Sequence, residues 1–158
     1  APEGVMLPPR KQVLLRVRAA APPTTMELRV RFVETDQMGV VHHSAYVPWL
    51  EAGRVEWLRD RGLSYREMED AGLSLAVAHV AVEYRAACYF DDVLNIMSVL
   101  TAVRSRGVSF TYRITRPADG ALVATAETRH VPTDRSGKAV RLPERWLSPL
   151  VALLENNP

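Results

Sequence analysis

The sequence predicts an α+β domain in which a curved antiparallel sheet covers one long helix, and three features of the chain support that prediction. Residues 27–33 alternate between apolar and polar side chains, which is the period of a strand. The stretch from Tyr46 to Trp57 repeats apolar side chains at helical spacing. Four strand-like runs follow one another between residues 73 and 131. A long helix with an apolar face has to be covered, and one sheet wrapped around it is the economical solution.

The first 25 residues differ from the remainder of the chain. We therefore expect an N-terminal extension over residues 1–25 and one compact domain over residues 26–158. Prolines bracket the extension and exclude a long helix there. Residues 12–18 alternate, which is consistent with an added edge strand, an arm on a neighbouring subunit, or an extension without function.

The long helix is expected to end at Gly62, a typical C-cap residue. Its apolar face consists of Tyr46, Leu50, Gly53 and Trp57. Pro48 deep inside a helix would cost roughly 3 kcal/mol. We therefore expect regular helix to begin within a turn of Pro48, after an irregular N-terminal turn.

The second half of the domain is expected to be mainly sheet. Ser64 and Glu67 form a capping-box pattern, so a short helix should run from there to near Gly72. The strand-like runs cover residues 73–84, 93–104, 108–116 and 121–131. Residues 142–155 predict a terminal helix broken near Pro149. A single sheet leaves its edge strands exposed, so pairing with a second copy is expected.

The composition of the 158 residues is that of an ordinary globular protein, with 47% hydrophobic and 24% charged residues. No apolar run approaches the ~20 residues of a membrane-spanning helix, so no membrane association is expected. A net charge of +2 is too small to indicate nucleic-acid binding. Cys88 is the only cysteine and cannot form an internal disulfide, which favours a reducing, cytoplasmic setting.

The segment from Glu34 to Tyr46 holds the candidate chemistry. It leads from the first strand into the long helix, and it places Asp36 and His43 seven residues apart around a loop that Gly39 allows to turn sharply. A carboxylate beside the free N–H groups of a helix N-terminus is suited to attack on a carbonyl carbon. We interpret this segment as the active-site loop of a small hydrolase, although an aspartate that only caps the loop amides would look the same.

The same residues resemble a known family. Thr35 to Tyr46 (TDQMGVVHHSAY), followed by Trp49 to Arg54 (WLEAGR), is similar to the signature of the 4-hydroxybenzoyl-CoA thioesterase-like acyl-CoA thioesterases. The similarity continues through Val82 to Ala87 (VEYRAA) and covers roughly residues 26–147.

The resemblance implies a hotdog fold, hydrolysis of acyl-CoA without a metal or organic cofactor, and active sites at the interface of at least a homodimer, with a homotetramer as the larger alternative. It implies that Asp36 is the catalytic carboxylate and that the backbone N–H of His43 binds the thioester carbonyl. The His43 side chain is a second candidate for catalysis. Some members carry a tyrosine four residues before the aspartate, where this chain has Phe32.

The expected substrate contacts fall into two groups. The loop and helix start should line the acyl site through Gly39, Val40, Val41, His42 and Tyr46. Basic residues should bind the phosphates of coenzyme A. The candidates are Arg104, Ser105 and Arg106 at a strand turn, and Arg85.

Two other functions remain open from the sequence. A non-hydrolytic module that binds acyl-CoA or an acyl carrier protein would keep the pocket and lose the chemistry, and Phe32 is compatible with it. A metal protein would use Asp36, His42 and His43, but adjacent histidines cannot easily face one ion. On the helix, Glu51 and Arg54 are expected to form an ion pair, with Glu51 as an alternative second carboxylate.

Overall fold

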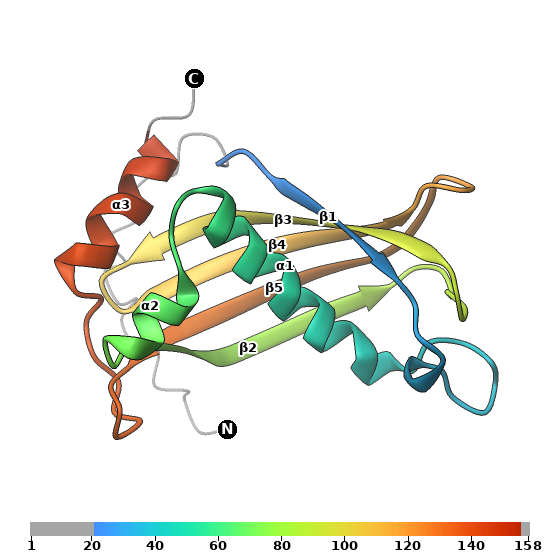
Figure 1. Ribbon diagram of the computed structural model, residues 1–158, viewed down its shortest axis with the longest axis horizontal. Coiled ribbons are helices and arrows are strands. Elements are labelled where there is room, and N and C mark those ends of the chain that lie inside the picture. The colour runs from blue at the N-terminus through green and yellow to red at the C-terminus, as the bar shows by residue number, and fades with distance from the viewer. Residues whose placement is uncertain (1–20, 156–158) are drawn as a thin grey trace, which may run out of the picture.

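The computed structural model describes residues 21–155. It contains one five-stranded sheet in the order β1-β3-β4-β5-β2, in which all neighbours are antiparallel (Figure 1). The strands are β1 (Thr24–Arg29), β2 (Ser74–Tyr84), β3 (Val93–Arg104), β4 (Gly107–Arg116) and β5 (Ala121–Thr133). The predicted α+β architecture is confirmed.

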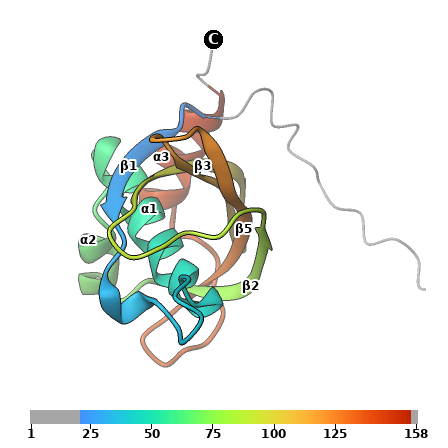
Figure 2. The same ribbon diagram turned by 90° about the vertical axis from the view of Figure 1, so that its right-hand side faces the viewer.

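The long helix α1 (Tyr46–Asp60) lies across the inner face of the sheet, and the sheet curls around it when the molecule is viewed end on (Figure 2). Its predicted apolar face is buried. Gly53 lies where the helix comes closest to β3, because a Cβ there would stand 2.4 Å from Oγ of Ser98. The short 3₁₀ turn η2 (His43–Ala45) precedes α1, which confirms the irregular turn expected before Pro48.

The first strand is displaced from its predicted range. β1 begins at Thr24 rather than at residue 27, and Ala21 is already buried. The strand ends at Arg29, and residues predicted to continue it form the 3₁₀ turn η1 (Phe32–Glu34). The carboxylate of Glu34 accepts a hydrogen bond from the N–H of Arg31 at 2.7 Å, which folds the chain back locally. The alternating run over residues 12–18 lies outside the described residues.

Two shorter helices close the left-hand end of the sheet in Figure 1. In α2 (Tyr65–Asp70), Ser64 Oγ accepts the N–H of Glu67 at 3.2 Å, as the capping pattern predicts. The terminal helix α3 (Glu144–Glu155) runs through Pro149 without the predicted break. Its apolar stripe packs beside β3 and is buried, and this burial offsets the roughly 3 kcal/mol that an internal proline costs. The stripe consists of Trp146, Leu150 and Leu154.

Strand β2 forms one edge of the sheet and has no neighbour on its outer side among residues 21–155. Val77, Val80 and Tyr84 face the same side as α1, yet all three are exposed. An apolar row on an unpaired edge strand is a surface that favours strand pairing with another chain. No helix in residues 21–155 has the length and apolar character needed to cross a bilayer.

Candidate active site

A tight hairpin loop carries Asp36 at the N-terminal end of α1. Thr35 and Val41 pair as an isolated bridge, and Asp36 N–H donates to Val40 O at 2.9 Å. Gly39 turns the loop with φ of 80°, a conformation that glycine adopts without steric cost. The N–H of Met38 donates to Oδ1 of Asp36 at 2.8 Å. Oδ2 of Asp36 accepts no hydrogen bond from the described residues, so one carboxylate oxygen holds the loop and the other is available.

The entrance to α1 is capped by a histidine. Nδ1 of His42 accepts the N–H of Ser44 at 3.1 Å, which makes His42 the N-cap of η2. His43 is the first residue of that turn, and within residues 21–155 no acceptor is found for its backbone N–H. Unpaired N–H groups at a helix start carry partial positive charge. They can therefore stabilise an oxyanion.

The loop, the helix start and the end of β2 enclose a hollow of about 380 Å³. The predicted site residues Asp36, Val40, Val41, His43, Tyr46 and Arg85 all line it, and Met38, Tyr84, Ala86 and Ala87 complete its wall. Asp36 and His43 thus face one cavity although they lie on different secondary elements. Gly39 and His42 shape this cavity through the backbone and the cap but do not line it.

The second group of predicted substrate contacts lies elsewhere within this chain. Arg104, Ser105 and Arg106 belong to the β3–β4 turn, at the left-hand end of the sheet in Figure 1, whereas the Asp36 loop lies at the right-hand end. Strands β3 and β4 cross the whole sheet, so their connecting turn cannot reach the hollow in one chain. Arg85 does reach it and pairs with Glu83 at the surface.

Aromatic side chains form the floor of the hollow. The rings of Tyr46 and Tyr84 meet edge to face at 5.0 Å. The Tyr46 hydroxyl lies 3.2 Å from Sγ of Cys88, and burial raises the pKa of both groups. Neither group is therefore an acid or base near neutral pH. Tyr84 O–H donates to His43 O at 2.8 Å and ties β2 to the helix start.

Two contributors to the site were not among the predicted site residues. Tyr84 was present in the VEYRAA segment that carries the resemblance, so the signal was available. The sequence contains no indication of the role of Glu34. The alternation of the preceding run would place it on the same side as Leu28 and Val30, but nothing shows which donor a carboxylate there would bind. In the structure it is only 8% exposed and binds the indole of Trp49.

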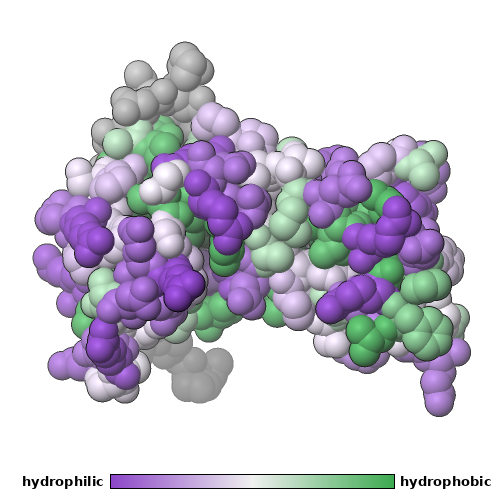
Figure 3. Space-filling model, viewed as in Figure 1, coloured by the Kyte–Doolittle hydropathy of each residue, from purple (hydrophilic) through white to green (hydrophobic). Residues whose placement is uncertain are grey.

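Apolar side chains are exposed around the mouth of the hollow, at the right-hand end of the molecule in Figure 3. They belong to the loops that follow β1 and β2. Phe32 packs edge to face against Phe90 with 5.7 Å between ring centroids. It does not line the hollow. The exposed set consists of Phe32, Val33, Met38, Tyr89 and Phe90.

The described part of the chain offers no cluster of three His, Cys, Asp or Glu side chains that could hold a metal ion. His42 uses Nδ1 in its cap, so the trio Asp36, His42 and His43 does not converge. The expected ion pair of Glu51 and Arg54 is not among the ion pairs of the described residues. Arg54 acts instead on the buried Tyr112 and His130. Burial raises the pKa of Tyr112 despite the opposing charge of Arg54, whereas burial and then the charge of Arg54 both lower the pKa of His130.

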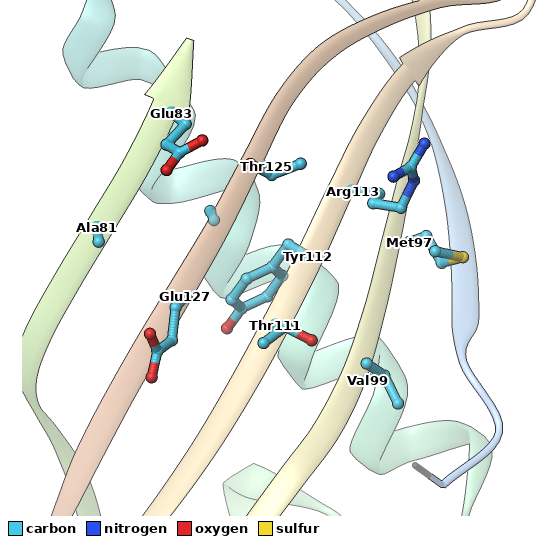
Figure 4. Close-up of a pocket in the computed structure, with 10 residues that line it drawn as sticks. Ala81, Glu83, Met97, Val99, Thr111, Tyr112, Arg113, Thr125 and Glu127 are labelled. Atoms are coloured by element: carbon cyan, nitrogen blue, oxygen red, sulfur yellow. The ribbon is translucent and has the colours of Figure 1, made fainter. Parts of the chain in front are cut away.

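A second hollow, of about 400 Å³, lies on the outer face of the sheet, away from α1 (Figure 4). Glu83 and Glu127 stand on one side of it and Arg113 on the other, with Thr111 and Thr125 between them. It contains none of the predicted site residues.

Known proteins match this chain over most of its length. A sequence profile of the thioesterase-like superfamily matches residues 30–150. The acyl-CoA thioester hydrolase YbgC of Escherichia coli is 35% identical over 107 residues, which are 68% of this chain and 79% of that protein. Hypothetical protein TT1821 from Thermus thermophilus superposes with a TM-score of 0.78 at 37% identity, over 84% of this chain and 98% of its own.

A more distant structure shows the same architecture. The DHNA-CoA thioesterase from Staphylococcus aureus, at 24% identity, superposes with a TM-score of 0.78 over 84% of this chain and 89% of its own. This likeness concerns the fold alone. Together with the strand order and the enclosed helix, it confirms the predicted hotdog fold.

Proposed function

The chain belongs to the thioesterase-like superfamily and is an acyl-CoA thioesterase, and we propose that Asp36 and the N–H of His43 carry out the hydrolysis. The supporting observation is that Asp36 and His43 line one hollow at the N-terminal end of α1. The carboxylate has a free oxygen, and the N–H has no acceptor within residues 21–155. These are the two groups that attack on a thioester carbonyl requires.

Two routes use these groups, and the proposal includes both. As a general base, Asp36 takes a proton from a water whose oxygen attacks the carbonyl carbon. The His43 N–H then stabilises the oxyanion, and collapse breaks the C–S bond and releases a thiolate that receives the proton from Asp36. As a nucleophile, Asp36 bonds to the acyl carbon and expels the thiolate, and water then hydrolyses the resulting anhydride.

The complete site is proposed to require a second copy of the chain. The unpaired edge and exposed apolar row of β2 would pair with the same strand of the partner across a two-fold axis. Antiparallel pairing brings opposite ends of the two sheets together. The β3–β4 turn of the second copy, with Arg104, Ser105 and Arg106, would then approach the same end of the assembly as Asp36 and offer donors to the coenzyme A phosphates.

A homotetramer would need a second surface, and the outer face of the sheet is the proposed one. Carboxylates and a guanidinium stand on opposite sides of small, uncharged residues there (Figure 4). A two-fold stack of two such faces would set the acidic side of one against the basic side of the other. Light scattering in solution distinguishes dimer from tetramer. The cytoplasmic location stays a prediction.

The test separates the side chain of residue 43 from its backbone. Asp36→Asn should abolish CoA release from a panel of acyl-CoAs in a thiol assay. His43→Ala removes the imidazole alone, whereas His43→Pro also removes the N–H. Proline is tolerated at the first helical position, and His42 already has the extended φ of −62° and ψ of 139° that a following proline requires.

If the backbone donor binds the oxyanion, His43→Pro should lower kcat about 10²–10³-fold, and His43→Ala should lower it much less. Equal losses in the two variants would assign the role to the imidazole. Binding of acyl-CoA without any release of CoA by the native protein would refute hydrolysis and favour the binding module.

A further inference from the structure

The loop that carries Asp36 is joined to α1 by a buried polar contact. Nε1–H of Trp49 donates to Oε2 of Glu34 at 2.6 Å. Glu34 is 8% exposed and Trp49 only 2% exposed. Hydrogen bonds to a charged acceptor are stronger than neutral ones, and more so away from water. The contact therefore joins two elements that lie fifteen residues apart in the sequence.

Glu34 uses both its side chain and its backbone to hold the loop. Oε1 accepts the N–H of Arg31 at 2.7 Å, on the side where β1 ends. Its main-chain oxygen accepts the N–H of His42 at 2.8 Å, on the side where η2 begins. Glu34 thus connects the two stems of the Asp36 loop, and its carboxylate connects both to Trp49 in the first turn of α1.

We propose that Glu34 and Trp49 are positioning residues of the thioesterase site, which set the distance between the Asp36 carboxylate and the His43 N–H. The inference rests on the proposed function of that site. Asp36 lies two residues after Glu34, and His43 lies one turn before the helix that carries Trp49. The Glu34–Trp49 contact therefore fixes the attacking group relative to the oxyanion donor. A misplacement of about 1 Å between such groups can cost a factor of about 10² in rate.

A carboxylate suits this role better than an apolar side chain of equal size. Burial raises the pKa of Glu34, but the N–H of Arg31, its guanidinium and the indole of Trp49 outweigh burial and hold the pKa below its ordinary value. Glu34 thus stays charged and keeps all its donors. An apolar residue would leave the Arg31 N–H and the indole N–H without their acceptor, and an unpaired donor in a buried position is unfavourable.

Trp49→Phe tests the proposal, because it removes the indole donor and keeps an aromatic ring beside Tyr46, whose centroid lies 4.9 Å away. The chain offers a matched control. Trp57 lies on the same helix, is fully buried, and donates its Nε1–H to Pro22 O at 3.0 Å, away from the hollow. Trp57→Phe therefore has a comparable cost in packing and hydrogen bonding without touching the Asp36 loop.

We expect Trp49→Phe to lower kcat by about 10- to 100-fold with KM within about twofold of the native value. Trp57→Phe should leave both constants within about twofold. Glu34→Gln should lower kcat similarly. The double variant Glu34→Gln/Trp49→Phe should lose little more than the worse single variant, because the two side chains act as one unit.

Amide hydrogen exchange gives a readout that does not need turnover. The N–H groups of Asp36, Gly39 and His42 are hydrogen-bonded within the loop. Their exchange should accelerate in Trp49→Phe and stay unchanged in Trp57→Phe. The positioning role is overturned if exchange in the loop is the same in the two variants, or if kcat of Trp49→Phe matches that of Trp57→Phe. Absence of hydrolysis in the native protein would instead refute the proposed function.

Discussion

Replacement of Gly53 by alanine tests how closely α1 lies on the sheet. A Cβ at this position would stand 2.4 Å from Oγ of Ser98 and 3.1 Å from Cγ2 of Ile96. The first distance is far inside van der Waals contact, and the Ser98 side chain has no exposed surface into which it can move. Insertion of a methyl group into such a site typically costs about 1–3 kcal/mol. Alanine gains about 1 kcal/mol over glycine in helix propensity, so Gly53→Ala should lower the free energy of unfolding by about 1 kcal/mol.

The Ser98 hydroxyl identifies the source of this cost. Its Oγ is buried and has no hydrogen-bond partner among the described residues, so Ser98→Ala should be neutral or stabilising by about 1 kcal/mol. In that background the atom nearest the new methyl is gone, and only Ile96 remains close. Gly53→Ala should then be neutral or stabilising. The coupling energy between the two substitutions is therefore expected to be about 1–2 kcal/mol.

Urea unfolding of the native protein, both single variants and the double variant measures this cycle, with constant m-values as the check on two-state behaviour. Additivity within about 0.5 kcal/mol would refute the reasoning, because it would mean that the cost of alanine at position 53 does not arise at Ser98. The outcome bears on function, since the same close approach sets where the N-terminal end of α1 lies beside the Asp36 loop.

Two further predictions address assembly and pH. Val80→Glu should prevent formation of the proposed dimer, as measured by light scattering, and reduce thioesterase activity, because the partner strand would bury the new carboxylate. Ala81→Glu, on the outer face of the same strand, is the control. A dimer that persists in Val80→Glu would exclude pairing through β2. Burial and the nearby charge of Arg54 lower the pKa of His130 to about 4 from an ordinary value of 6.5. Between these two pH values His130 is therefore protonated in the unfolded chain and neutral in the folded chain. The contribution of His130 to the free energy of unfolding is therefore fully present above about pH 6.5, and it falls by about 3 kcal/mol as the pH drops toward 4. Unfolding of the native protein and of His130→Gln across that range should give visibly different pH slopes, and equal slopes would contradict the assignment.

Much of the fold followed from periodicity alone. The face of α1 and the four strands after residue 73 agree with prediction to within about two residues, because each has a long, regular pattern with an apolar side that must be buried. The two misassigned segments are short or interrupted. The predicted strand extended to residue 33, but the chain turns before it, where the carboxylate of Glu34 accepts the N–H of Arg31. Pro149 is accommodated because burial of the helix around it outweighs the local cost.

Prediction of the site depended on how local each feature is. Asp36, Gly39 and His43 lie within one loop, so their spacing in the sequence already brings them together. The Arg104–Arg106 turn is separated from that loop by the full length of β3, and the proposed dimer is the arrangement that would bring the turn of one copy near the loop of the other. No periodicity argument detects such a relation, because the position of an edge strand relative to a two-fold axis is not encoded in any one segment.

The burial and the hydrogen-bond partner of Glu34 could not be predicted from the segment that contains it. The alternation of the preceding run would place Glu34 on the side of Leu28 and Val30, opposite the exposed Glu27 on β1, but the segment itself does not show what a buried carboxylate there would bind. The carboxylate binds Trp49, whose indole N–H would be a buried donor without a partner if no acceptor lay over it. A tryptophan on the buried face of a helix therefore implies an acceptor somewhere in the fold. In this chain the acceptor is Glu34, on the turn η1 that lies beside the start of α1. The same carboxylate also holds the Asp36 loop through the N–H of Arg31.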